Sequence, residues 1–107
     1  MLGTDLIQLS DFSAKFSNSE LLKKIFVESE LKQNKTSESL AGVFAAKEAF
    51  FKALGEKKDW LDVWVEKQST GKPTINSIYL HTDQKAEVSI SHSGDYAIAT
   101  VIITLEV

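Results

Sequence analysis

The chain has 107 residues, with 12 lysines, 15 acidic residues, no arginine and no cysteine, which gives a net charge of −3. This length predicts one domain spanning residues 1–107, and the negative charge argues against a nucleic-acid partner. No apolar run approaches the roughly 20 residues of a membrane span, and no basic-then-apolar leader opens the chain, so we expect no membrane partner and a cytoplasmic location.

The first third of the chain predicts a strand followed by short helices. Residues 2–9 alternate well enough to form a strand or a strand-to-helix turn. Residues 11–30 carry apolar side chains at mixed spacings of three and four, which indicates one or two short amphipathic helices. The polar segment 34–39 predicts a loop.

The clearest predicted helix covers residues 39–54. Ser37 or Ser39 is a candidate N-cap, and Gly55 is suited to end the helix. Its apolar positions recur with helical period and predict a buried stripe, formed by Leu40, Val43, Phe44, Phe51 and Leu54.

The pattern then changes to the period of two that is typical of strands. The predicted strands are residues 62–67, 74–80, 87–91 and 96–105, with turns at 69–73 and 92–95. Helices therefore precede strands, which predicts an α+β fold with one long helix packed on a mostly antiparallel sheet.

Glu48 and Lys52 lie four residues apart and so share one face of the predicted helix with the small residues Ala41, Ala45 and Ala49. A surface ion pair would explain them. The functional alternative is a carboxylate that holds a hard cation beside a lysine that meets phosphate.

Asp5 is the acid of an otherwise small and apolar opening segment. A lone acid near a terminus is commonly solvated or caps a helix. Its functional interpretation needs a second carboxylate, because Mg²⁺ takes one or two carboxylates together with substrate phosphate and water. Asp5 and Glu48 would supply that pair if the fold brings them together.

Two further segments have both a structural and a functional interpretation. His92, followed by Ser93-Gly94-Asp95, is either a histidine bonded to its own turn or a group facing a ligand. Gly71-Lys72-Pro73 is sufficiently explained as a hairpin turn, and it is no P-loop. Without arginine, any phosphate site must use lysine, histidine, backbone N–H groups or a metal.

These segments occur in an order that resembles the short, stand-alone 4′-phosphopantetheinyl transferases, the holo-[acyl-carrier-protein] synthase family. The matching segments are Gly3-Thr4-Asp5-Leu6, the helix at 40–55 with its Phe-x-x-Lys-Glu-Ala-x-x-Lys-Ala core, Asp62-Val63-Trp64-Val65 with Gly71-Lys72-Pro73, and the hairpin at 88–99. The resemblance covers nearly the whole chain.

The resemblance implies transfer of the 4′-phosphopantetheine arm of coenzyme A to a serine of an apo-acyl carrier protein, in support of fatty acid biosynthesis. It implies Mg²⁺ dependence, release of adenosine 3′,5′-bisphosphate, and a homotrimer with active sites at its interfaces. Asp5 and Glu48 match the family's metal-binding and catalytic acids, and Lys52 matches its helix lysine, which contributes to catalysis and coenzyme binding. The positions that match its other coenzyme-binding residues are Lys72, Pro73, Ser91 and His92. The general base stays open between Glu48 and a metal-bound water.

The chain departs from the family in its basic residues. The arginine that usually follows the central Ala-Gly is Val43 here. Segment 11–24, where the family commonly carries carrier-docking arginines, offers Lys15, Lys23 and Lys24, so steering of an acidic carrier is expected to be weaker. The alternative interpretation is a non-catalytic homologue that binds coenzyme A or a carrier.

Overall fold

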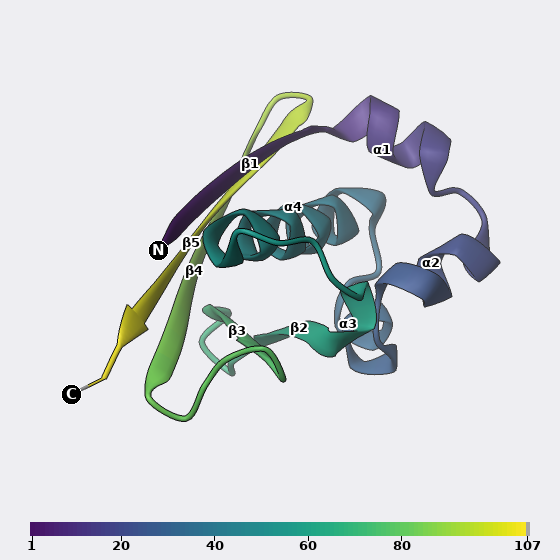
Figure 1. Ribbon diagram of the computed structural model, residues 1–107. Helices are drawn as coiled ribbons and strands as arrows, with labels where there is room; N and C mark the ends of the chain where they lie inside the picture. Colours follow the sequence, from purple (N-terminus) through teal and green to yellow (C-terminus); the bar gives the residue numbers. More distant parts are fainter. Residues whose placement is uncertain (107) are drawn as a thin grey trace.

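A computed structural model describes residues 1–106, and it has the predicted α+β architecture (Figure 1). The elements in chain order are β1 (Leu2–Gln8), α1 (Leu9–Lys15), α2 (Ser19–Ile25), α3 (Glu28–Gln33), α4 (Ser37–Leu54), a 3₁₀ turn (Trp60–Asp62), β2 (Val63–Lys67), β3 (Pro73–Ser77), β4 (Gln84–Ser93) and β5 (Tyr96–Leu105). Within these residues no helix combines the length and apolar character needed to cross a membrane.

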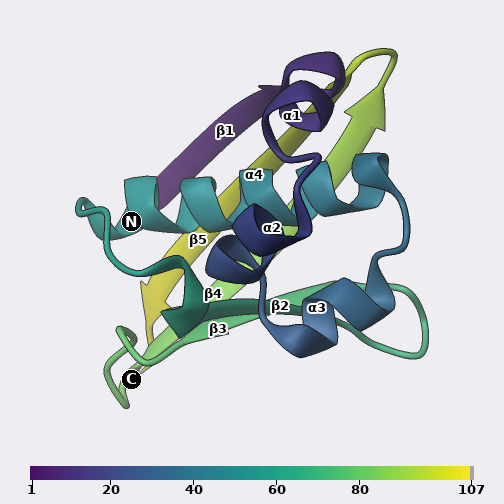
Figure 2. The ribbon, with the colours of Figure 1, turned by 90° about the vertical axis from the view of Figure 1, so that its right-hand side faces the viewer.

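The strands form two antiparallel sheets. The larger sheet has the strand order β1-β5-β4, and the smaller sheet is the β2–β3 hairpin. In the larger sheet, Ala99 of the central strand β5 lies between Asp5 of β1 and Ile90 of β4. Helix α4 crosses one face of the larger sheet (Figure 2). The residues that face it alternate with exposed ones along β5, and Val101 and Ile103 are buried there against α4. The core therefore lies between one long helix and three strands, as expected.

Helix α4 begins two residues earlier than predicted. Its N-cap is Thr36, whose side-chain oxygen accepts a hydrogen bond from the backbone N–H of Ser39 at 3.0 Å, so the predicted caps at Ser37 and Ser39 are wrong. The predicted end at Gly55 is confirmed. This glycine has a φ of +84°, a left-handed conformation that favours glycine at the residue after a helix.

The other differences between the prediction and the structure lie in the number of short helices and at the ends of the strands. Residues 9–33 form three short helices rather than one or two. Strand β3 ends at Ser77 because the Ser77 hydroxyl donates to the Asp62 carbonyl at 2.7 Å and accepts from the Tyr79 N–H at 3.0 Å, which turns the chain. Strand β4 is longer than predicted, and the hairpin turn is confined to Gly94 and Asp95. His92 therefore lies in the strand.

A buried ion pair joins the short helices to α4. Lys47 and Glu30 are both fully buried, and their charged atoms lie 2.6 Å apart. The Lys47 ammonium also donates to the carbonyls of Ile25 and Trp60, while the Glu30 carboxylate accepts from the N–H groups of Val27 and Val65. Burial lowers the pKa of Lys47, and the Glu30 carboxylate partly offsets that effect. Every charge-bearing atom has partners, so the pair fixes how these elements meet.

Candidate active site

The first group of predicted residues lies where β1 crosses α4. Gly3 and Asp5 are two residues apart, so they share the face of β1 that packs on the helix. Gly3 approaches α4 so closely that a Cβ there would overlap the Ala49 carbonyl oxygen and lie 2.6 Å from the Ala53 nitrogen. This close approach places the Asp5 side chain against the last turns of α4.

Asp5 contacts Lys52 directly. The Lys52 ammonium donates to Asp5 Oδ1 at 2.8 Å and to the Thr4 carbonyl at 3.0 Å. The Asp5 side chain is 11% exposed, and its second oxygen, Oδ2, is buried without a hydrogen-bond partner in residues 1–106. An unsatisfied buried carboxylate oxygen is costly. The arrangement therefore leaves an open acceptor inside the site.

Glu48 precedes Lys52 by one turn on the same face of α4. The surface ion pair between them, one of the two sequence interpretations, does not form. The Glu48 carboxylate instead lies 3.6 Å from the ammonium of Lys57. Glu48, Lys52 and Lys57 line one depression at the end of α4.

The donor set at this crossing fits a hard divalent cation. Asp5 offers the open Oδ2 atom, and Glu48 offers a carboxylate that is 25% exposed. Across residues 1–106, no three His, Cys, Asp or Glu side chains cluster as a metal site of their own. One or two carboxylates completed by substrate phosphate and water is the usual arrangement for Mg²⁺ in phosphate-transferring sites.

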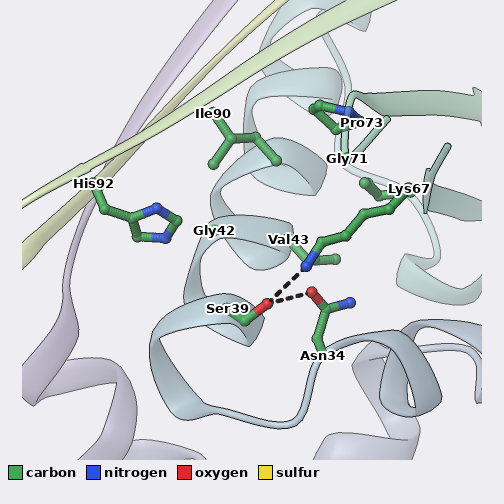
Figure 3. Close-up of a pocket in the computed structure, with 10 residues that line it drawn as sticks. Asn34, Ser39, Gly42, Val43, Lys67, Gly71, Pro73, Ile90 and His92 are labelled. Atoms are coloured by element: carbon green, nitrogen blue, oxygen red, sulfur yellow. Dashed lines mark hydrogen bonds between the residues drawn. The ribbon is translucent and has the colours of Figure 1, made fainter. Parts of the chain in front are cut away.

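The second group of predicted residues is separate from the first. A cavity of about 150 Å³ opens between α4, β2 and β4 (Figure 3). Its apolar surface comes mainly from Val43, Val65, Ile90 and Pro73, and its polar groups are Asn34, Ser39, Lys67 and His92. Gly42 lets α4 pack closely on β4, because a Cβ there would lie 3.0 Å from atoms of Ile90 and His92. Hereafter this cavity is called the β4 pocket.

His92 and Pro73 lie in the β4 pocket, whereas two other predicted coenzyme-binding residues lie elsewhere. His92 Nε2 donates to the Glu38 carbonyl at 3.0 Å, which excludes the interpretation that His92 is bonded to its own turn. Ser91 has the opposite orientation on β4, because successive strand residues face opposite sides. Lys72 lines a neighbouring depression together with Pro73 and Lys85.

Helix α4 separates the two groups within one chain. Val43 lines the β4 pocket, and Glu48 follows it by five residues, which is about 140° of rotation and about 7.5 Å of rise along the helix. Asp5 belongs to β1 and His92 to β4, the two edges of the larger sheet. The two groups therefore lie on different sides of α4.

The far face of the larger sheet is exposed and apolar. Outward-facing side chains on β1 and β5 alternate with the buried ones, and the large apolar ones are Leu2 (65% exposed), Leu6 (60%), Ile98 (41%) and Ile102 (43%). The register places Leu2 opposite Ile102 and Leu6 opposite Ile98, and the hydrogen-bonded hydroxyls of Thr4 and Thr100 lie between these two apolar pairs. A patch of this kind is typical of a surface that another protein chain covers.

Sequence reasoning missed two groups of polar residues. Lys67, Ser39 and Asn34 are hydrogen-bonded to one another in the β4 pocket. Nothing in the spacing of these residues shows that α4 and β2 bring them together. The second group is the buried Lys47–Glu30 pair. The sequence did mark Lys47 as unusual, because it lies four residues from both Val43 and Phe51 and so falls within the apolar stripe of α4.

Comparisons with known proteins agree with this architecture. A family model described as the 4′-phosphopantetheinyl transferase superfamily matches residues 1–101. The chain is 38% identical to the holo-[acyl-carrier-protein] synthase of Nautilia profundicola, over 96% of this chain and 98% of that protein, and 38% identical to the synthase of Clostridium tetani, over 95% and 93%.

Solved structures show the same fold. The holo-[acyl-carrier-protein] synthase of Helicobacter pylori in complex with coenzyme A superposes with a TM-score of 0.89 at 30% identity, covering 97% of this chain and all of that one. The synthase of Bacillus anthracis in complex with coenzyme A (3′,5′-ADP) gives a TM-score of 0.84 at 29% identity, covering 99% and 96%.

Proposed function

The chain belongs to the 4′-phosphopantetheinyl transferase superfamily, and on that basis we propose that it moves the 4′-phosphopantetheine arm of coenzyme A to a serine of an apo-acyl carrier protein. The products are the holo-carrier and adenosine 3′,5′-bisphosphate, and the reaction supports fatty acid biosynthesis in the cytoplasm. The observation that carries the proposal is the contact of the largely buried Asp5 carboxylate with the half-exposed Lys52 ammonium, one helical turn from Glu48 on α4.

The reaction is a phosphoryl transfer. The carrier serine oxygen forms a bond to the phosphorus that carries the pantetheine arm, and the bond from that phosphorus to the oxygen shared with the second phosphate breaks. The electron pair of this bond leaves with adenosine 3′,5′-bisphosphate, and the serine proton passes to the general base, which is the Glu48 carboxylate or a water molecule. Such a transfer needs positioning and neutralisation of the phosphate charge more than covalent participation by the protein.

Asp5 and Glu48 would hold the metal in this proposal. The open Oδ2 of Asp5 and the partly exposed carboxylate of Glu48 are the oxygen donors that Mg²⁺ prefers. When bound, Mg²⁺ supplies charge neutralisation and orientation at the pyrophosphate.

Lys52 would stabilise the leaving group. Its ammonium is half exposed and is held by Asp5 and the Thr4 carbonyl. A cation fixed in this way can donate to the phosphate oxygens that gain negative charge as the bond breaks. The same lysine also contributes to coenzyme binding.

The β4 pocket would take the adenosine end of the coenzyme, with Pro73 and His92 as contacts. Because α4 separates this pocket from Asp5 and Lys52, we propose that a complete site combines the β4 pocket of one copy with the crossing of another. The exposed apolar patch on β1 and β5 supports an association of copies, and the resemblance to the family supports a homotrimer. Lys72 and Ser91, which lie outside the pocket, would then contact coenzyme A at the interface between copies.

The experiment is an intact-mass measurement of apo-carrier proteins incubated with the enzyme, coenzyme A and Mg²⁺. We expect a gain equal to the mass of the 4′-phosphopantetheine arm, and no gain with the folded variant Glu48→Gln. Robust transfer by that variant would remove Glu48 from the site. Coenzyme A binding without transfer to any carrier would instead indicate a binding protein.

A further inference from the structure

We propose that Lys57 is a movable cation of the transfer site, which neutralises Glu48 while the site is empty and turns to the pyrophosphate of coenzyme A when the ligands enter. The inference rests on the proposed function and adds a residue to its site. Lys57 lies in the short loop that follows α4, at the edge of the depression that Glu48 and Lys52 also line.

The end of α4 brings Lys57 back to the site. Gly55 has a left-handed conformation and ends the helix, so the chain turns there instead of continuing along the helix axis. Two residues later, the Lys57 ammonium lies 3.6 Å from the carboxylate of Glu48. Lys52 lines the same depression. An anion that binds against Lys52 in this depression would therefore also face Lys57.

An aromatic platform holds the Lys57 side chain. The Lys57 ammonium lies over the Trp60 ring, 4.6 Å from its centre, which is a cation–π contact. Trp60 is itself held by Phe44, which stacks on it with ring centres 5.0 Å apart, and by Phe51, which meets it edge-on at 5.4 Å. A lysine ammonium is a point charge on a flexible stem. It can therefore move between neighbouring acceptors while its stem stays on the ring.

The contact of Lys57 with Glu48 is weaker than the contact of Lys52 with Asp5. At 3.6 Å it is longer than a hydrogen bond, whereas Lys52 donates to Asp5 at 2.8 Å. The Lys57 side chain is 63% exposed, and an exposed ion pair contributes little to stability. Glu48 is therefore readily released to a metal, and Lys57 to a phosphate.

The charges of the site show what Lys57 contributes. Two carboxylates (Asp5 and Glu48) and two ammonium groups (Lys52 and Lys57) leave the empty site without net charge. Mg²⁺ is doubly positive and the pyrophosphate is doubly negative, so the charges balance again when both are bound. Either ligand alone leaves an uncompensated charge in a partly buried site, which is unfavourable. The positive charge of Lys57 therefore favours coenzyme A and opposes Mg²⁺ that binds without it.

The test measures two affinities by calorimetry, that of coenzyme A with a chelator present and that of Mg²⁺ without coenzyme A. Lys57→Met keeps the stem on Trp60 and removes the charge. Its affinity for metal-free coenzyme A should fall about tenfold, the low end for a hydrogen bond to a charged group, because Lys57 is exposed. Its affinity for Mg²⁺ should rise about two- to fivefold, because Glu48 loses a competing cation.

The matched control is Lys58→Met, which removes the same charge from the adjacent residue. Lys58 pairs with Glu56 at 3.3 Å and lies over the Tyr79 ring. Both affinities of this control should equal those of the wild type. Lys57→Arg, which keeps the charge, should stay within about twofold of the wild type in both measurements.

The opposite signs of the two changes separate this role from a structural one, because a damaged site would bind both ligands more weakly. A weakening of both affinities in Lys57→Met would overturn the inference, as would unchanged affinities or equal changes in Lys58→Met. Absence of any coenzyme A binding by the wild type, with or without Mg²⁺, would instead refute the proposed function, so the two failures are distinguishable.

Discussion

The substitution Asp5→Asn separates a metal-binding role of Asp5 from a purely structural one. The change keeps the size of the side chain and removes its charge. In the native protein one carboxylate oxygen accepts from Lys52 at 2.8 Å, and the other is buried without a partner. A structural ion pair would have no reason to leave that second oxygen unsatisfied.

The two contributions of Asp5 to stability nearly cancel. A hydrogen bond to a charged group stabilises by about 1.5–3 kcal/mol, and a buried oxygen without a partner costs about 1–3 kcal/mol. Without metal, Asp5→Asn keeps a hydrogen bond to Lys52 but loses its negative charge, and it still leaves one buried polar atom without a partner, so we expect a loss of about 1–2 kcal/mol in the free energy of unfolding. Metal at about a hundredfold above its dissociation constant adds about 2.7 kcal/mol to a protein that binds it only when folded.

The assay is urea denaturation followed by tryptophan fluorescence, with saturating coenzyme A and with or without Mg²⁺. We expect Mg²⁺ to stabilise the wild type by about 2–3 kcal/mol and Asp5→Asn by almost nothing. Asp83→Asn, a substitution of an exposed acid in a loop, is the control and should respond like the wild type. Equal stabilisation of Asp5→Asn by Mg²⁺ would refute the metal role, and a loss above about 3 kcal/mol without metal would show a structural ion pair.

Three further predictions concern the scaffold of the site. Lys47→Met should lower the free energy of unfolding by about 3–5 kcal/mol, because it leaves the Glu30 carboxylate buried and without its partner. Urea denaturation measures this loss, and a loss below about 1 kcal/mol would contradict the prediction. Gly3→Ala should lower the free energy of unfolding by about 1–3 kcal/mol, because the new Cβ would overlap the backbone of α4. The same shift of β1 should weaken Mg²⁺ binding, and an unchanged Mg²⁺ affinity in calorimetry would argue against the close approach. The hydrogen bond to Asp62 raises the pKa of Tyr79 above its ordinary value near 10, so its stabilising contribution is present below pH 10 and is lost as pH rises through the folded pKa. The difference in unfolding free energy between wild type and Tyr79→Phe should therefore shrink above pH 10, and a difference that is constant with pH would contradict the bond.

Local patterns were sufficient to predict the long helix and the strands with clear apolar periodicity. The apolar stripe of α4, its end at Gly55 and the alternation in β5 each depend on neighbours within a few residues. The segment 9–33 was harder, because its three helices are each about two turns long or less and are held by packing rather than by their own periodicity. The Lys47–Glu30 pair shows one reason, since it fixes that segment through contacts that no local pattern records.

The candidate site depends on contacts that span the whole chain. The sequence suggested Asp5 and Lys52 as separate candidates, but their contact joins residues 47 positions apart and exists only because β1 lies on α4. Helix spacing alone left a Glu48–Lys52 surface ion pair as one of two interpretations, and that pair does not form because Lys52 reaches across to Asp5 of β1. Lys67 could not be identified from the sequence, because β2 and α4 form the pocket only after folding.

The intact mass of an apo-acyl carrier protein, measured after incubation with this enzyme and coenzyme A, tests the central claim most directly. With Mg²⁺, the carrier should gain the mass of one 4′-phosphopantetheine arm while an equal amount of adenosine 3′,5′-bisphosphate is released. With a chelator, or with the Asp5→Asn variant, its mass should stay unchanged. An unmodified carrier in the presence of Mg²⁺ and bound coenzyme A, for every carrier tested, would contradict the account.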